Sequence, residues 1–451
     1  MRESVSAVFV TNEKVFFVKR QNYLPVFPGY HAAPGGKVDK TDSSAPFPDS
    51  FWPRVENPQV LHALIREIKE ELNFDLLQAI ESKEVLSIDY IGLAITPEFN
   101  PYRFKNYYFK ITLSHEINFD LDSNEAEYGE WNTPVGLHQK YKEGRLLAVP
   151  PAVILLETFV ANLGHSEAID MSLPHDPETE VAMIESIHGV RQLLPLSNTF
   201  PPANRTNSFI IGDGGESSRK LLIDPSPKDE SELKKFLKSI DKIGFDSIFL
   251  THHHPDHCQY VREIALLYGV GIELSADTAA RIKINKGDDY FDDIPLTFRS
   301  EGDIVTKSLG QNIRVYEVPG HDEGQLALAP ENLNWFLVGD LIQTIGTVVI
   351  QAPEGDMKKY FHSLNRVIAL NPKNIIPSHG IIIGGTNKLI ETLTHRQMRE
   401  DSIIKLLSEN KSEEEMLAII YEGLAPELLP YALRTIKAHL KKINEDRLEK
   451  F

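Results

Sequence analysis

THHHPDH, residues 251–257, is the stretch of sequence that decides the fold of the central part of this chain. It follows the apolar residues 248–250, which predict the end of a buried strand, and it precedes residues 260–267, whose apolar spacing predicts a helix. Because side chains two residues apart on a strand share a face, His252 and His254 can bind one metal ion. Asp256 and His257 lie where the chain turns into the helix and can face a second ion. The stretch therefore predicts a metal site.

Three further candidate ligands follow predicted strands in the same part of the chain. His321 comes after the strand-like residues 313–318, Asp340 ends the run 335–339, and His379 follows two isoleucines. These side chains share one rim of a sheet if the strands run alike. Imidazole nitrogens and carboxylate oxygens suit zinc, and manganese or iron are alternatives.

Together these residues closely resemble the motifs of the metallo-β-lactamase-fold superfamily, over roughly residues 185–388. The resemblance implies an αββα sandwich with two metal ions, which acidify a water molecule and polarise a substrate oxygen. It further implies Asp224 as the aspartate that supports the site and Asp256 as a catalytic residue. The implied ligands are His252, His254 and His321 for the first ion, Asp256, His257 and His379 for the second, and Asp340 as the bridge.

Two features narrow the branch of the superfamily. Histidine occupies position 254, where the flavodiiron oxygen reductases carry glutamate, so oxygen chemistry is disfavoured. Only residues 341–378, which number 38, separate Asp340 from His379. This segment leaves no room for the large inserted domain of the RNA-cleaving β-CASP branch.

The C-terminal part resembles the winged-helix tail of the β-lactamase-like protein 2 group in residues 394–407 and 432–440, and residues 204–209 also look like that group. Its mitochondrial member is a ribonuclease for single strands, so single-stranded RNA is an alternative substrate. Lys437, Lys441 and Lys442 could contact a phosphate backbone, and the competing interpretation is a solvated helix face.

A second group of acidic residues lies near the N-terminus, in PGGKV at residues 34–38 and REIKEELNF at residues 66–74. In the second segment the apolar residues form one helical stripe, while Glu67, Glu70 and Glu71 gather on another face. Such clustered carboxylates repel one another unless a cation lies between them. Ligands that offer only oxygen favour magnesium or manganese, which can bridge a substrate diphosphate. Arg66 can pair with Glu70 and orient it.

These two segments together resemble a Nudix box. The resemblance implies an α/β/α sandwich that cleaves diphosphates, with Glu67, Glu70 and Glu71 as catalytic metal ligands and Gly35, Gly36 and Arg66 as cofactor-binding residues. Asn73 replaces the usual glycine, and asparagine also suits a left-handed helix end. About sixteen extra residues precede Arg66, and this insertion resembles the coenzyme A diphosphatase branch. A Nudix fold without activity is the alternative.

Composition limits the classes of function. The net charge is −18, which argues against broad binding of duplex nucleic acid. The single cysteine rules out an internal disulfide and fits a reducing compartment. No apolar run approaches the ~18 residues of a membrane span. The N-terminus lacks the pattern of a signal or transit segment. The expected location is the cytoplasm.

The sequence thus predicts a multidomain protein of the α/β and α+β classes. Its expected parts are a Nudix-like domain at 1–163, a linker at 164–184, a metallo-β-lactamase-fold domain at 185–388 and a small helical, winged-helix-like tail at 389–451. The predicted function is a bifunctional metal-dependent hydrolase that acts on an ester or thioester and on the diphosphate of a nucleoside or coenzyme A derivative. The alternatives are a single-strand ribonuclease or phosphodiesterase, and a Nudix fold that only senses a nucleotide. The sequence predicts no oligomeric state.

Overall fold

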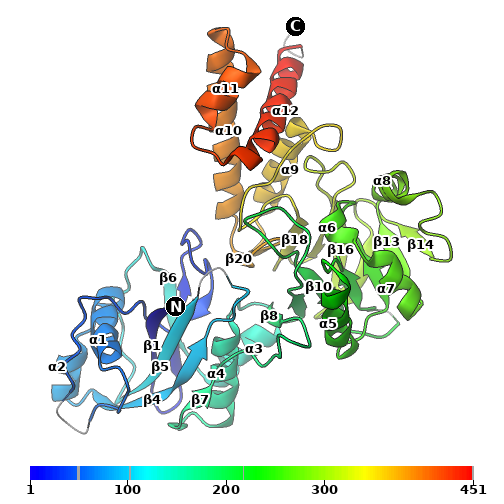
Figure 1. The fold of residues 1–451 in the computed structure, drawn as a ribbon. Coiled ribbons are helices and arrows are strands. Elements are labelled where there is room, and N and C mark those ends of the chain that lie inside the picture. The colour runs from blue at the N-terminus through cyan, green and yellow to red at the C-terminus, as the bar shows by residue number, and fades with distance from the viewer. Residues whose placement is uncertain (48–50, 101–102, 217, 449–451) are drawn as a thin grey trace. The chain divides into compact units, whose positions relative to one another are not determined.

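The computed structural model describes residues 1–47, 51–100, 103–216 and 218–448 and forms two compact units. Unit 1 comprises residues 1–175 and 184–188, and unit 2 comprises residues 176–183 and 189–451. Figure 1 shows the elements of both units along the chain.

Unit 1 is built on one mixed sheet whose strands are ordered β3-β2-β1-β5-β4-β7, with β6 paired to β2. The central strands β1 and β5 run parallel and are mostly buried, as expected where helices cover both faces. The strands are β1 (Arg2–Val10), β2 (Val15–Arg20), β3 (His31–Ala32), β4 (Val85–Ile95), β5 (Phe104–Leu113), β6 (Ala126–Asn132) and β7 (Ile169–Asp170).

Helices lie on both faces of this sheet. On one face α1 (Gln59–Leu72) and α2 (Leu76–Glu81) share a core with Phe9 and Phe109. On the other face α3 (Pro134–Lys142) and α4 (Pro150–Ala161) pack against Val8 and Phe17. Unit 1 is therefore the α/β/α sandwich that the sequence predicted.

The segment 164–184, expected to be a linker, is only partly irregular. Its residues Ile169 and Asp170 form β7, which pairs in parallel with Gly92 and Leu93 of β4. The following Met171 is fully buried in the unit 1 core. A two-residue strand leaves too little periodicity to be seen in the sequence. β8 (Met183–Ile187) follows, where the chain passes between the units.

Unit 2 contains two sheets. In the first, the strands β14-β13-β12-β11-β10-β9 lie in this order, and β11 to β14 run parallel. The second has the order β15-β16-β17-β18-β19-β20. The first sheet's strands are β9 (Val190–Leu193), β10 (Ser208–Ile211), β11 (Leu221–Ile223), β12 (Ser247–Phe249), β13 (Gly271–Leu274) and β14 (Leu296–Phe298). The second sheet's strands are β15 (Ile304–Ser308), β16 (Gln311–Glu317), β17 (Leu326–Pro330), β18 (Phe336–Gly339), β19 (Asn374–Pro377) and β20 (Ile383–Gly384).

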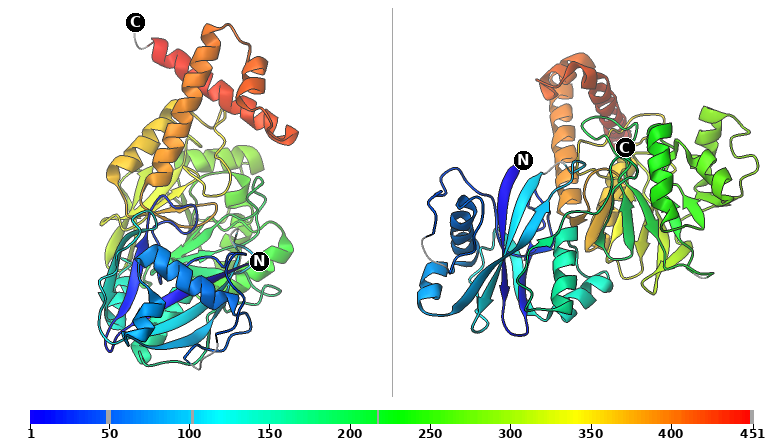
Figure 2. Two further views of the ribbon diagram at one scale, coloured as in Figure 1. Left: turned by 90° about the vertical axis from the view of Figure 1, so that its left-hand side faces the viewer. Right: turned by 60° about the horizontal axis from the view of Figure 1, so that its bottom comes forward.

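Each sheet of unit 2 has its own helical layer, so the layers follow the predicted αββα order (Figure 2). The first sheet shares a core with α5 (Glu230–Asp241), α7 (Val261–Tyr268) and α8 (Ala276–Lys286). The second packs against α9 (Met357–Leu370). The short helix α6 (Pro255–Cys258) lies between β12 and α7.

The tail is helical, as predicted. It consists of α10 (Asn387–Ser408), α11 (Glu413–Ile420), the short 3₁₀ helix η1 (Pro426–Leu428) and α12 (Leu429–Leu448). Leu389 of α10 and Ala438 of α12 belong to the same core as α9 and the second sheet. Throughout the described ranges, no helix is both long and apolar enough to cross a membrane.

Candidate metal centre and carboxylate site

The predicted ligands of unit 2 follow strands, and so does Asp224, the predicted supporting aspartate. Asp224 comes directly after β11, His252 three residues after β12, and Asp340 directly after β18. His379 follows β19, and His321 lies in the loop between β16 and β17. These positions follow from the sheet topology, because loops at the ends of strands bring residues that are distant in sequence to one edge.

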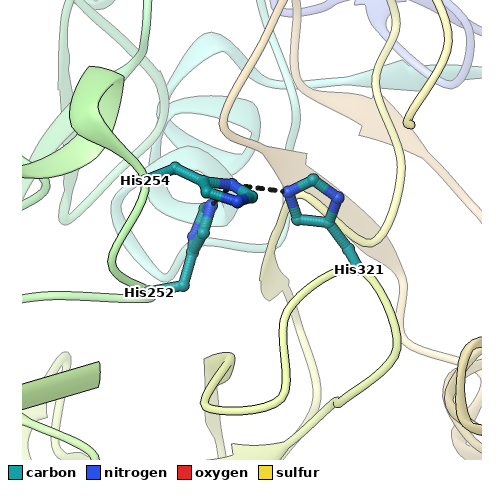
Figure 3. A group of neighbouring side chains, drawn as sticks. All are labelled: His252, His254 and His321. Carbon is teal, nitrogen blue, oxygen red and sulfur yellow. Dashed lines mark hydrogen bonds between the residues drawn. The ribbon is translucent and has the colours of Figure 1, made fainter. Parts of the chain in front are cut away.

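His252, His254 and His321 form one group (Figure 3). The Nδ1 atom of His254 lies 2.9 Å from Nε2 of His252 and 3.0 Å from Nε2 of His321. Two nitrogens bound to one tetrahedral zinc ion are roughly 3.3 Å apart. The three imidazoles thus present their inner nitrogens at a spacing that fits a single ion.

A second group consists of Asp256, His257 and His379, and Asp340 lies between the two groups. Asp340 Oδ1 is 3.6 Å from His257 Nε2 and 3.3 Å from His379 Nε2, while its Oδ2 is 3.6 Å from His321 Nε2. His257 Nε2, His379 Nε2 and Asp340 Oδ1 are buried and have no hydrogen-bond partner among the described residues. Because such groups are costly without a partner, this arrangement fits a cation.

The outer nitrogens of His252 and His257 are held by the pair Asp224 and Thr251. Asp224 Oδ2 accepts from His257 Nδ1 at 2.8 Å and from the Thr251 hydroxyl at 2.6 Å, and Asp224 Oδ1 accepts from the Thr251 backbone N–H at 2.8 Å. Thr251 Oγ1 lies 3.0 Å from Nδ1 of His252. A single buried carboxylate therefore orients both imidazoles, which leaves their Nε2 atoms directed at the centre.

The other three histidines also have partners on their outer nitrogens. The Nδ1 of His379 donates to the Arg205 carbonyl at 2.9 Å, and the Nδ1 of His321 donates to the Val349 carbonyl at 2.9 Å. His254 Nε2 lies 3.5 Å from the Glu354 carboxylate. The sequence analysis missed Thr251 and Glu354 as supporting residues. No motif marks Glu354, and a backbone carbonyl carries no residue-type signal at all.

The histidines of the cluster differ in the direction in which their surroundings shift the pKa. Burial lowers the pKa of His252 well below its usual value and lowers that of His321 to about 4, which keeps these imidazoles neutral. Burial also disfavours a charge on His257, but the carboxylates of Asp256 and Asp340 outweigh burial and raise its pKa well above the usual value. The neutral His252 and His321 together with the nearby carboxylates form a donor set that suits a divalent transition metal.

Most of the cluster is buried, and two of its members are partly exposed. The side chain of His254 is 19% exposed and that of Asp256 is 15% exposed, whereas His252, His257 and His379 are almost fully buried. His254 and Asp256 therefore mark the side of the cluster that solvent reaches.

In unit 1, the predicted acidic residue Glu71 lies beside the Gly-Gly turn. Its Oε2 accepts from the Gly35 backbone N–H at 2.9 Å, so the Gly-Gly turn and α1 meet at this carboxyl group. Burial raises the pKa of Glu71 to about 7. Gly36 packs against Glu67 so closely that a Cβ atom at position 36 would lie 2.3 Å from Glu67 Oε2. Burial also raises the pKa of Glu67.

Arg66 organises the rest of this site. Its guanidinium makes two hydrogen bonds to Asp42, at 2.8 and 3.0 Å, and the hydrogen bond lowers the Asp42 pKa. Arg66 Nη1 also lies 2.8 Å from Glu67 and 3.0 Å from Glu70. The pairing of Arg66 with Glu70 agrees with the sequence analysis. Asp42, which lies six positions after Gly36, is the main partner of Arg66.

The three carboxylates of α1 do not form one cluster. Within the described residues, Glu67, Glu70 and Glu71 are absent from the sets of side chains whose ligand atoms lie within 4.8 Å of one another. The Glu70 side chain is 59% exposed and pairs with Arg66. Asn73 ends α1 in the left-handed conformation, with φ 49° and ψ 32°, as the sequence analysis expected. The assignment of the three glutamates as ligands stays a prediction.

The three tail lysines considered for RNA binding all have acidic partners. Lys437 lies 3.5 Å from Glu413, Lys441 is 2.7 Å from Asp356, and Lys442 is 2.7 Å from Glu400. Each of these lysines therefore forms an ion pair with a carboxylate of unit 2.

Comparison with known proteins agrees with this division. Residues 201–379 match the metallo-beta-lactamase superfamily, residues 1–145 match the NUDIX domain, and residues 412–448 match the beta-lactamase associated winged helix domain. The chain therefore combines these three domains, and the first two indicate a hydrolase. The metallo-beta-lactamase fold also implies binding of a divalent metal, and the His/Asp cluster is a candidate site for it.

Three relatives illustrate the range of similarity. A Beta-lactamase-like protein 2 homolog of Drosophila melanogaster is 28% identical over 53% of this chain and 82% of its own length. A hydroxyacylglutathione hydrolase of Cereibacter sphaeroides is 28% identical over 40% of this chain and 64% of its own. An atrochrysone carboxyl ACP thioesterase of Aspergillus fumigatus is 27% identical over 46% of this chain and 45% of its own.

Proposed function

We propose that unit 2 hydrolyses a thioester or ester with two divalent metal ions, which we assign as zinc. The observation that carries the proposal is the convergence of His257 Nε2, His379 Nε2 and Asp340 Oδ1. The two buried nitrogens lie 3.6 and 3.3 Å from the buried oxygen, and none of the three atoms has a hydrogen-bond partner in the described part of the chain. Zinc suits a donor set of imidazoles and carboxylates. Two such ions supply Lewis acidity, which acidifies water and polarises the carbonyl of the substrate.

The protein's own groups hold this chemistry in place. His252, His254 and His321 would hold one ion, Asp256, His257 and His379 the other, and Asp340 would bridge the two. Each histidine is fixed through its outer nitrogen, so the donor set is formed before a substrate arrives.

Asp256 is the candidate residue for handling the proton of the attacking water. It is partly exposed and its Oδ2 also lies 3.4 Å from the Thr206 hydroxyl. Hydrolysis of a thioester adds water to the carbonyl carbon, breaks the C–S bond, and transfers a proton to the departing thiolate. The products are a carboxylate and a free thiol.

For unit 1 we propose cleavage of a diphosphate in a nucleoside or coenzyme A derivative. Glu67, Glu70 and Glu71 would hold magnesium or manganese, which prefer oxygen ligands. The buried Glu71 beside the Gly35 N–H supports this role, because carboxyl groups with a raised pKa concentrate at functional sites. Arg66 would orient Glu67 and Glu70, to which it is bonded.

The two activities combine in one substrate class, acyl-coenzyme A. One half would remove the acyl group, and the other would split the diphosphate to release 4′-phosphopantetheine. The names of two relatives, a hydroxyacylglutathione hydrolase and an acyl carrier protein thioesterase, support a thioester for unit 2. RNA hydrolysis is the alternative, and the acidic partners of Lys437, Lys441 and Lys442 weigh against it.

The test uses the full chain with zinc and magnesium and measures free thiol and 4′-phosphopantetheine released from acyl-coenzyme A. His254→Ala should abolish thiol release and spare the diphosphatase, while Glu71→Gln should do the reverse. Release of neither product by the parent chain would overturn the pairing. A parallel assay with short single-stranded RNA decides the alternative, since cleavage that requires Asp256 would replace the thioester proposal.

A further inference from the structure

The loop between β18 and α9 lies against the first histidine group. Within it, residues 348–356 (segment 348–356) provide the outer partners of two of the three histidines. The Val349 carbonyl accepts from His321 Nδ1 at 2.9 Å, and the Glu354 carboxylate lies 3.5 Å from His254 Nε2. Both contacts leave the opposite ring nitrogen, His321 Nε2 or His254 Nδ1, directed at the group.

The same segment is anchored beside His321 at its far end. The Asp356 N–H donates to the Gly320 carbonyl at 2.8 Å, and Asp356 caps α9. Gly320, with φ 131°, packs so tightly on α9 that a Cβ atom there would lie 2.3 Å from the backbone of Tyr360. The Tyr360 hydroxyl donates to the Leu341 carbonyl, next to Asp340. Segment 348–356 and the start of α9 thus contact the neighbours of two predicted ligands.

On its other side, the segment is held by the helical tail. Arg396 of α10 donates to the Val348 carbonyl, and its guanidinium lies 5.7 Å from the centre of the Tyr360 ring. Arg434 of α12 donates to Gln351 at 2.7 Å, and Lys441 of α12 donates to Asp356 at 2.7 Å. The tail therefore forms hydrogen bonds with the segment at its beginning, middle and end.

Within the tail, buried charged side chains join α10 to α12. Arg396 and Glu400 of α10 are each 5% exposed, and Glu400 pairs with His439 and Lys442 of α12. The ion pair between Glu400 and Lys442 joins the two helices, because breaking a buried pair leaves an uncompensated charge. Helices α10 and α12 contact each other, and both also contact α9.

We propose that the helical tail, acting through segment 348–356, positions His254 and His321 for the first metal ion, with Glu354 as the positioning residue for His254. The Glu354 carboxylate lies 3.5 Å from Nε2 of His254, so the opposite ring nitrogen, Nδ1, is the one that would hold the ion. Outer partners of metal-binding histidines typically change metal affinity by 10–100-fold when they are removed. The ion pair between Lys441 of α12 and Asp356 would therefore help to position the metal-binding histidines, a role that does not involve nucleic acid.

The experiment measures zinc binding by the full chain in competition with a chromogenic chelator, and it needs no substrate. One variant, Glu354→Gln, acts directly on His254. A double variant, Arg434→Met with Lys441→Met, removes hydrogen bonds between the tail and the segment at two exposed positions where a folding defect is not expected. Lys437→Met is the matched control, because Lys437 is an exposed cation of the same helix whose partner is Glu413 of α11.

The parent chain should bind two zinc ions tightly. In both test variants one of the two should bind about tenfold more weakly, with the other unchanged, and the control should match the parent. Equal affinities in parent and test variants, or an equal loss in Lys437→Met, would overturn the inference. A loss in Glu354→Gln alone would overturn the part assigned to the tail. The inference rests on the proposed metal centre, and a parent chain that binds no zinc would instead refute that centre.

Discussion

Replacing Glu71 with glutamine should stabilise unit 1 above neutral pH while it removes the proposed diphosphatase activity. In the folded chain, burial raises the pKa of Glu71 from 4.5 to about 7. The charged form is therefore disfavoured by the fold. A glutamine keeps an oxygen that accepts from the Gly35 N–H, yet it carries no charge to bury.

The size of the effect follows from the difference in pKa. With an ordinary pKa in the unfolded chain, the difference is about 2.5, and at ~1.4 kcal/mol for each tenfold step it corresponds to about 3 kcal/mol. The sign follows from proton binding. Because the folded state holds the proton more tightly, the stability of the parent falls as pH rises from about 4.5 to about 7. The variant should match the parent at low pH and exceed it above pH 7.

The assay is urea unfolding in the presence of EDTA. Unfolding is monitored by hydrogen exchange in peptides from β1 and α1, because these peptides report on unit 1 alone. Glu70→Gln is the matched control, since this carboxylate is 59% exposed on the same helix and its loss should change stability little. A Glu71→Gln variant that gains nothing at pH 8, or that gains as much at pH 4, would refute the assignment of Glu71 as a buried, proton-binding carboxyl.

Three further results are expected. Asp224→Asn should weaken zinc binding by about 10–100-fold in chelator competition, because it removes the carboxylate that orients His257, and unchanged affinity would contradict that role. Gly36→Ala should lower diphosphatase kcat/KM at least about tenfold without altering thiol release, because its Cβ would collide with Glu67, and normal turnover would show that this close packing is dispensable. Removal of zinc with a chelator should lower the free energy of unfolding of unit 2 by about 2.7 kcal/mol for each bound ion, relative to zinc at a hundred times its Kd, and should spare unit 1; a stability of unit 2 that is independent of zinc would argue against a bound ion.

The sequence predicted the layered folds because they depend on patterns that repeat. The apolar residues before position 251 are strand β12, and the carboxylates of residues 66–74 lie on the single helix α1. The two sheets of unit 2 and the helical tail also follow the expected order. β7 was missed, because a strand of two residues inside a polar segment has no measurable period.

The residues of the candidate metal centre were predictable for a different reason. His252, His254, Asp256 and His257 are close in sequence, so their spacing alone suggests shared ligation, whereas His321 is distant from them and was a candidate because it follows a predicted strand. The outer partners could not be found in this way. Val349 acts through its carbonyl, and Glu354 lies in a loop whose path depends on contacts with the tail.

The spacing of the unit 1 glutamates predicts a common face of α1, and the structure gives more detail than a helical wheel can. Glu71 turns to the Gly35 N–H, while Glu67 and Glu70 turn to Arg66. A helical wheel specifies the direction of each Cβ atom and leaves the outer part of a long side chain undetermined. Hydrogen bonds to neighbouring loops therefore decide where each carboxylate lies.

The most direct test of the metal centre is the zinc content of the full chain after saturation with zinc and removal of the excess by gel filtration. The convergence of the seven candidate ligands predicts about two zinc ions per chain. A folded chain that retains no zinc would contradict the account, because the buried nitrogens of His257 and His379 would then lack the partner for which they are arranged.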